Sequence, residues 1–300
     1  MTLRIDLGEV ITAMVTPMDS NKAVDYKGVE KVSKHLVEQK SDAIVIAGTT
    51  GESPTLTFEE EEEIFFCAKS AVGNDCKIIM GAGSNCTETA ISSSKRAEKN
   101  GADAILTVVP YYNKPSQQGL IEHFGAIAKS VDIPIILYNI QGRTGIDMAP
   151  STIAFLAKEY SNIVAVKQSN ANLDLISEIK MLCPDDFAIY SGDDSLTLPM
   201  MSIGAHGVVS VASHVVGNEI KSMIRNFKAG QITAASNMHK ILYPLFKKIF
   251  MAPNPTPIKA LLSKLELCEN SVRRPLVELD EQARLELVEC LNDVLAKIGQ

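Results

Sequence analysis

The sequence predicts an α/β protein: a (β/α)8 TIM barrel with a C-terminal helical appendage. Short runs rich in Val, Ile, Leu and Ala recur eight times, at a spacing of roughly 25 to 30 residues. Segments with helical periodicity separate them, as expected for parallel strands joined by crossover helices. No GxGxxG motif opens a helix after the first strand, so a closed barrel fits better than a doubly wound sheet.

The predicted strands are nearly continuous in apolar residues, which is typical of strands covered by helices on one face and by a barrel interior on the other. They are EVITAMVTP (9–17), DAIVIAGTT (42–50), KIIMGAGS (77–84), ADAILTVVP (102–110), PIILYNI (134–140), IVAVKQS (163–169), FAIYSGDD (187–194) and GVVSVAS (207–213).

Two of the intervening helices are well marked. One, over 57–72, begins with a Thr-Phe-Glu-Glu capping-box pattern, and the acidic run Glu59 to Glu63 is expected to be its solvated first turns. The other, over 117–130, places Leu120, Phe124 and Ile127 on one face.

The chain after the eighth strand contains more helix than a barrel needs. Helical segments are predicted near 216–229, 232–250, 256–265 and 280–297, and Pro253, Pro255 and Pro257 mark a connection between them. We therefore expect a catalytic barrel over residues 1–230 and a C-terminal helical domain over 231–300.

Composition excludes several classes of function. The 300 residues carry a net charge of −7 and show no basic cluster, which argues against a nucleic-acid partner. The six cysteines show no CxxC spacing and are expected to be reduced thiols, and the histidines form no metal-ligand pair. No signal-peptide stretch or membrane span is visible, so a cytoplasmic location is expected.

Polar residues follow the predicted strands at their carboxyl ends, where barrels of this kind place their chemistry. Lys167 is the sharpest of them, because it ends an otherwise apolar strand. An amine taken out of water is more readily neutral, and the neutral amine is the form that makes a Schiff base with a ketone. The alternative is that Lys167 reaches the surface or pairs with a carboxylate such as Asp193.

Each of the other candidates also has a plain structural alternative. Tyr138 on the fifth strand either points to the same mouth or is a core tyrosine, and Tyr111-Tyr112 could pack against another subunit. The Gly48–Ser53 turn, GTTGES, could hold a carboxylate or be an ordinary strand-to-helix turn. Arg143 could clamp a substrate carboxylate or be a surface arginine.

These motifs occur together in one order: GTTGES, PYYNKPSQQGL, ILYN with RTG close behind, a strand-end lysine and YSGDD. That order resembles the dihydrodipicolinate synthase family, within the pyruvate-dependent class I aldolases. The resemblance runs from about Val10 to the NPTPIKALL and RRPL segments near 254–276 and covers nearly the whole chain.

The resemblance implies a role for each matching position. Lys167 matches the Schiff-base lysine and Tyr138 the tyrosine that shuttles protons. The other implied positions are Thr49 and Tyr112 in the proton relay, the latter supplied across a subunit interface; Thr50 at the pyruvate carboxylate; Arg143 at the second substrate; and Gly192 and Val209 lining the pyruvate pocket.

The implied reaction joins pyruvate to aspartate semialdehyde on the route to diaminopimelate and lysine. The iminium acts as an electron sink, so that the pyruvate methyl group can lose a proton and become an enamine nucleophile. No metal or organic cofactor is implied. The implied partners are these small molecules and further copies of the chain, since the family is usually tetrameric.

Two segments depart from the family pattern. Gln168-Ser169-Asn170 replaces an acidic residue followed by Ala, and Ile140-Gln141-Gly142 replaces Val-Pro-Ser before the arginine. We expect these changes to affect the second-substrate side of the pocket. Two rival functions remain: a sister lyase that cleaves a sialic acid or a sugar-derived 2-keto acid, and a non-catalytic pyruvate-binding protein. Arg143-Thr144-Gly145 favours the synthase.

The family's lysine feedback site is only partly matched in this chain. Tyr111 and Asn85 match it, but Phe58 and Glu61 stand where inhibited members carry histidines, and Thr89 replaces a glutamate. We expect lysine to inhibit weakly or not at all.

Overall fold

The eight strands of the structure follow one another in chain order around a closed barrel, which confirms the predicted fold class. The computed structural model describes residues 5–299. The strands are β1 (Val10–Ala13), β2 (Ala43–Ile46), β3 (Lys77–Gly81), β4 (Ala104–Val108), β5 (Ile135–Asn139), β6 (Ile163–Gln168), β7 (Ala188–Ser191) and β8 (Gly207–Ser210).

Helices separate the strands and follow the last one. They are α1 (Tyr26–Glu38), α2 (Phe58–Val72), α3 (Thr87–Asn100), α4 (Gln117–Ala128), α5 (Gln141–Thr144), α6 (Pro150–Glu159), α7 (Leu173–Leu182), α8 (Thr197–Met201), α9 (Ser213–Lys228), α10 (Ile232–Lys248), α11 (Thr256–Lys264) and α12 (Glu281–Ile298). Two short 3-10 turns, η1 (Ser53–Thr55) and η2 (Asp194–Leu196), complete the elements.

Every predicted strand contains an observed one, but all eight predictions run on beyond the carboxyl end of the observed strand. The loop residues there are also apolar and buried, as Met14 and Val15 are after β1, so hydrophobicity does not mark where pairing stops. The capping box is confirmed at the start of α2: Thr57 Oγ1 accepts from Glu60 N, and Thr57 N donates to the Glu60 carboxylate.

The described residues group into two compact units. The first comprises residues 5–8 with Lys77–Val209, and the second comprises Glu9–Cys76 with residues 210–299. The expected boundary between residues 230 and 231 falls inside the second unit, in the turn between α9 and α10, and stays a prediction.

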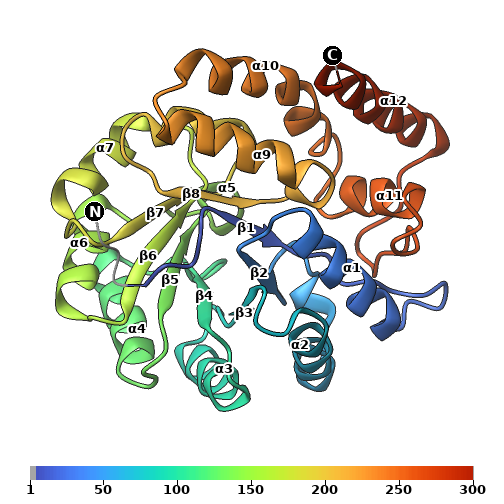
Figure 1. Cartoon of the computed structure of the whole chain (residues 1–300). Coiled ribbons are helices and arrows are strands. Elements are labelled where there is room, and N and C mark those ends of the chain that lie inside the picture. The colour runs from blue at the N-terminus through green and yellow to red at the C-terminus, as the bar shows by residue number, and fades with distance from the viewer. Residues whose placement is uncertain (1–4, 300) are drawn as a thin grey trace. The chain divides into compact units, whose positions relative to one another are not determined.

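The first unit contains five consecutive parallel strand pairs, from β3–β4 to β7–β8. Strands β4 to β7 lie side by side, with α3, α4, α6 and α7 on their outer side (Figure 1). The register places Tyr138 of β5 beside Lys167 of β6, and Lys167 beside Tyr190 of β7. Strand pairing alone therefore brings the two main candidates to the same level of the barrel.

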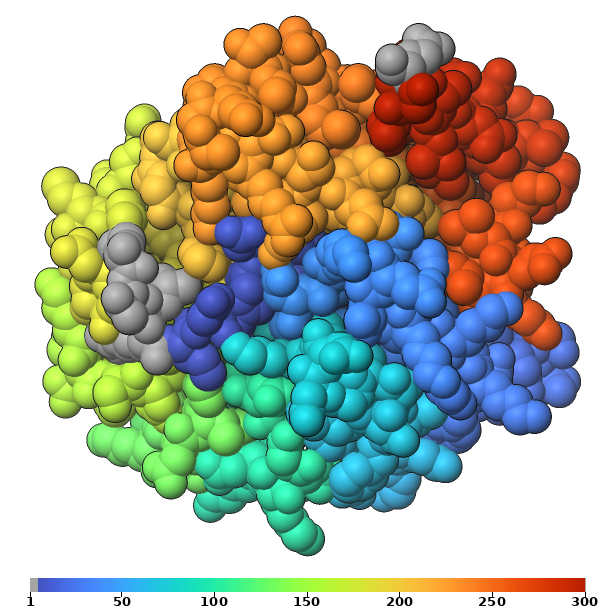
Figure 2. Space-filling model, in the orientation of Figure 1, coloured from blue at the N-terminus to red at the C-terminus, as the bar shows by residue number. Residues whose placement is uncertain are grey.

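The second unit joins the start of the chain to its end. Strands β1 and β2 pair in parallel, α9 packs on β1, and α10 lies between α9 and α12. In the space-filling view, the surface of the blue N-terminal part of this unit meets that of the orange C-terminal part directly (Figure 2). The C-terminal helices are thus part of one core with the first two strands.

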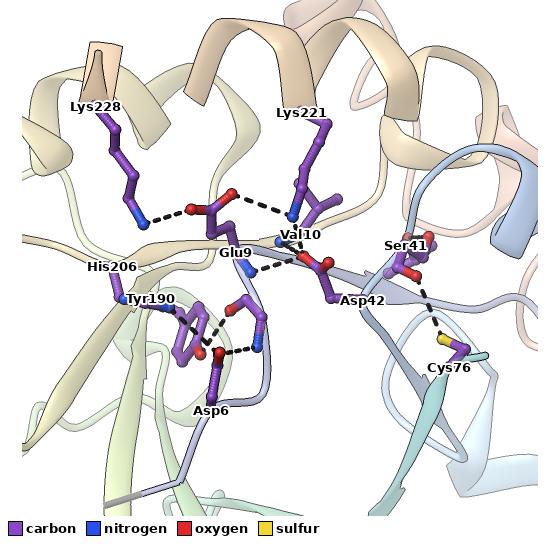
Figure 3. A network of polar contacts seen from close by, with 12 residues as sticks. Asp6, Glu9, Val10, Ser41, Asp42, Cys76, Tyr190, His206, Lys221 and Lys228 are labelled. Carbon is purple, nitrogen blue, oxygen red and sulfur yellow. Dashed lines mark hydrogen bonds and ion pairs between the residues drawn. The ribbon is translucent and has the colours of Figure 1, made fainter. Parts of the chain in front are cut away.

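Ion pairs tie α9 to the beginnings of β1 and β2. Lys221 Nζ lies 2.5 Å from the Asp42 carboxylate and 3.1 Å from that of Glu9, which also pairs with Lys228 (Figure 3). Asp42 further accepts from the backbone N–H groups of Glu9 and Val10. Although burial alone would raise it, the pKa of Glu9 is lowered by these two lysines. The network lies at the amino ends of the strands, the barrel face that serves stability.

A buried histidine occupies the opposite end of the same strands. His214 Nδ1 lies 2.8 Å from Val211 O, and its Nε2 accepts from Val15 N at 3.2 Å. These two bonds require the neutral ring with its proton on Nδ1, because a proton on Nε2 would face the Val15 N–H. Burial accordingly lowers the pKa of His214 to about 4.

None of the helices between residues 5 and 299 is both long and apolar enough to cross a membrane. All six cysteines are free thiols, as expected.

The pH dependence of stability tests the state of His214. The unfolded chain binds a proton near pH 6.5 and the folded chain only near pH 4, so folding stability is lost as pH falls through this interval, by about 3 kcal/mol for this group. We expect His214→Asn to be less stable at pH 7 but to lose less stability between pH 6.5 and 4.5. Urea unfolding at several pH values measures how steeply the free energy of unfolding changes with pH in the wild-type protein and in the variant.

His123, whose pKa burial also lowers to about 4, titrates in both proteins, so its contribution cancels in the comparison. Equal slopes would contradict this assignment.

Candidate active site

Lys167 is a buried amine at the end of β6. Its residue exposure is 7%, and its Nζ lies 4.2 Å from the centre of the Tyr138 ring. Tyr138 is equally buried, on the neighbouring strand. The two groups that a Schiff-base enzyme needs, an amine nucleophile and a phenol that exchanges protons, are therefore adjacent.

Lys167 neither reaches the surface nor pairs with Asp193. Asp193 turns its carboxylate to the start of η2, where Oδ1 accepts from the backbone and hydroxyl of Ser195. Lys167 takes part in no ion pair among residues 5–299, and it is too buried to be a surface lysine. Its amine remains over the ring of Tyr138.

Gly192, directly after β7, allows the side chains of β6 to approach. A Cβ built at this position would lie 3.1 Å from Lys167 Cε and 1.9 Å from Ser169 Oγ. Any side chain at residue 192 would have to displace the Ser169 hydroxyl. Gly192 thus lies beside the lysine stem, and the buried Val209 of β8 belongs to the same unit.

An amide and carboxylate network holds the ends of β5 and β6 together. Asn139 Nδ2 donates to Asp147 Oδ1 and to Gln168 Oε1, while Asn139 Oδ1 accepts from Met148 N. Asn170 Nδ2 donates to the second oxygen of Asp147. The polar residues that follow Tyr138 and Lys167 therefore hold the loop that carries α5, even though this loop lacks a proline before Arg143.

Arg143 and Tyr112 are both exposed. Arg143 is on α5, immediately beyond β5, and the residue is exposed. Tyr112 is 90% exposed and has a left-handed φ of 72°. An exposed phenol on a strained loop residue is consistent with a side chain that completes another subunit's site; this role stays a prediction.

Thr49 and Thr50 belong to the second unit, in the turn that follows β2. Thr50 is buried, and its Oγ1 accepts from Asn254 Nδ2 at 2.9 Å, which leaves its hydroxyl proton available for an acceptor. Gly51 O accepts from Thr16 Oγ1. The assignments of Thr49 to the relay and of Thr50 to the pyruvate carboxylate stay predictions.

A buried ion pair fixes the same turn from the C-terminal side. Lys259 Nζ lies 2.5 Å from Glu52 Oε1, and the two side chains are 0% and 1% exposed. Glu52 has a left-handed φ of 57°, a backbone conformation that is unfavourable for residues other than glycine. Its Oε2 accepts a hydrogen bond from Arg273 N. Burial lowers the pKa of Lys259, and the Glu52 carboxylate opposes that shift.

A closed eight-stranded barrel with a buried lysine at the end of its sixth strand, next to a tyrosine of the fifth, defines a lyase of the class I aldolase type. The model of the Dihydrodipicolinate synthetase family matches residues 6–294, and the chain belongs to that family.

Individual relatives are similar to this chain over nearly its whole length. The chain is 52% identical over 276 residues to a 4-hydroxy-tetrahydrodipicolinate synthase of a Cyanothece species, covering 92% of this chain and 94% of that protein. It is 48% identical over 274 residues to the enzyme of the same name from Desulforamulus reducens, covering 91% and 93%. The lysine-bound dihydrodipicolinate synthase structure from Cyanidioschyzon merolae has a TM-score of 0.94 and 47% identity, covering 96% of this chain and 98% of that one.

Several residues that shape the site were not singled out from the sequence. Asn254 and Lys259 lie within the NPTPIKALL segment, which carried the resemblance but had no assigned role. Asn139 ends the ILYN motif but had no assigned role, and Asp147 had no signal, because a polar residue beside a strand end is equally compatible with solvent. Their roles become visible only in the hydrogen bonds that the folded chain forms.

The buried ion pair gives a stability prediction. Lys259→Met leaves the Glu52 carboxylate buried without a counter-charge, and we expect a loss of about 3–5 kcal/mol in the free energy of unfolding. Adding Glu52→Gln removes that charge yet keeps an acceptor for Arg273 N, so the double variant should recover much of the loss. Denaturant unfolding of the two single variants and the double variant measures the coupling. Additive losses would show that the pair does not act as a unit.

Proposed function

We propose that this chain condenses pyruvate with L-aspartate 4-semialdehyde through a Schiff base on Lys167, the reaction of a 4-hydroxy-tetrahydrodipicolinate synthase. The observation that carries the proposal is the buried Lys167 amine above the ring of Tyr138, in a chain of this family. The names of its relatives, at 48% and 52% identity, support the particular substrates.

The first half of the reaction uses Lys167 and Tyr138. The neutral amine attacks the ketone carbon of pyruvate, and loss of water gives an iminium. This cation draws electrons from the adjacent methyl group, which loses a proton to become an enamine. The centre of the Tyr138 ring lies 4.2 Å from Nζ, and in this proposal the Tyr138 hydroxyl carries protons to and from the forming bonds, with Thr49 and a partner's Tyr112 completing the relay.

The remaining residues bind the substrates. Thr50 donates its hydroxyl to the pyruvate carboxylate, because Asn254 already occupies its acceptor side. Gly192 and Val209 line the pyruvate pocket. Arg143, exposed just beyond β5, receives the carboxylate of the semialdehyde, since its guanidinium can form two parallel hydrogen bonds to one carboxylate. No cofactor is needed for these steps.

The working form in this proposal is a cytoplasmic homo-oligomer, a tetramer as is usual in the family. The 90% exposure of Tyr112 supports it, because a tyrosine with that exposure has no role within its own subunit's relay. The second candidate function is cleavage of a sialic acid or sugar-derived 2-keto acid by the same Lys-Tyr pair. The Arg143-Thr144-Gly145 segment favours the synthase.

A substrate panel tests the proposed function. Pyruvate with aspartate semialdehyde should give product at a rate far above background, whereas N-acetylneuraminate and 2-keto-3-deoxy sugar acids should not be cleaved. Consumption of the semialdehyde and release of pyruvate are the two readouts. Cleavage of either acid without use of the semialdehyde would replace the synthase with the sister lyase.

A further inference from the structure

The Ser169 side chain carries a buried hydroxyl that the fold does not use. Its Oγ is shielded from solvent and has no hydrogen-bond partner among the residues that the structure describes. The residue itself is held firmly, since Ser169 N donates to Asn139 O at 2.9 Å. A buried hydroxyl without a partner destabilises the fold. At a reactive site, such a group is a candidate for hydrogen bonding to a substrate.

Ser169 lies next to the Schiff-base lysine and nearer the mouth of the barrel. It comes two residues after Lys167, so the alternation of a strand places both side chains on one face, about 6–7 Å apart along the chain. The space beside Gly192 confirms this, because both Ser169 Oγ and Lys167 Cε border the position of a Cβ built there.

Several neighbouring polar atoms already have hydrogen-bond partners. Ser191 Oγ donates to Asp193 O, and Asp193 Oδ1 accepts two bonds from Ser195. On the other face of the strand, Gln168 Oε1 accepts from Asn139, while Gln168 Nε2 has no partner among the described residues. A bound molecule that reaches the lysine from the carboxyl ends of the strands can supply the partner that Ser169 lacks.

We propose that the Ser169 hydroxyl donates a hydrogen bond to the aldehyde oxygen of the second substrate and so helps to select it; this inference rests on the proposed function. When the enamine carbon bonds to the aldehyde carbon, the C=O π electrons move to oxygen, which becomes an alkoxide and then takes a proton from the relay. The nitrogen returns to an iminium. Ser169 transfers no proton; its fixed O–H stabilises the oxygen as negative charge develops there.

The test is steady-state kinetics of Ser169→Ala with each substrate varied in turn. We expect kcat/KM for the semialdehyde to fall by about 100- to 1,000-fold, as for the loss of one donor to a developing oxyanion. The KM for pyruvate and the extent of borohydride trapping with pyruvate alone should be unchanged. The melting temperature should not fall, because the substitution removes an unsatisfied buried hydroxyl.

Two further variants separate hydrogen bonding from packing. Ser169→Cys keeps the shape but is a weak donor, so it should resemble Ser169→Ala. Ser177→Ala, which removes an exposed hydroxyl bonded to Leu173 O on α7, is the matched control and should resemble wild type.

An unchanged kcat/KM for the semialdehyde in Ser169→Ala would overturn the inference, as would a Cys variant with wild-type kinetics. Failure of the wild-type protein to use the semialdehyde at all would instead reject the proposed function.

Discussion

The amine of Lys167 is kept out of water above the ring of Tyr138, and the other features of the site depend on that placement. The register of β5 against β6 sets the two residues at one level. Their neighbours, Asn139 and Gln168, are bonded to each other, and Asn139 is also bonded to the loop beyond β5, so the two strand ends are linked. Gly192 leaves room for the lysine stem on the next strand. The pairing of β5 with β6 and the space beside Gly192 thus determine where the Lys167 amine lies.

In the second unit, residues near the end of the chain hold the turn that follows β2. The turn that carries Thr49 and Thr50 contains a non-glycine residue in a left-handed conformation, Glu52, and segments about 200 residues later in sequence hold it there. Lys259 neutralises Glu52 in a dry interior, and Asn254 orients the hydroxyl of Thr50. The helices after the barrel therefore contribute directly to a turn assigned to substrate binding, in addition to enlarging the core.

Much of this arrangement follows from the sequence because its signals are local. The eight apolar runs, the capping box at Thr57 and the solitary Lys167 each depend on residues close in the chain, and the structure confirms their positions. The pairings of Asn254 with Thr50 and of Lys259 with Glu52 depend on the tertiary fold, and no periodicity encodes them. The unsatisfied hydroxyl of Ser169 was visible only as a departure from a family pattern; its burial beside Gly192 requires three-dimensional structure.

Reductive trapping shows whether Lys167 is the residue that binds pyruvate covalently. The protein is incubated with pyruvate and sodium borohydride, digested, and its peptides are weighed by mass spectrometry. We expect one reduced pyruvate adduct, on the peptide containing Lys167, and none in a Lys167→Arg variant. Absence of an adduct in the wild-type protein, or an adduct on another lysine, would contradict this expectation.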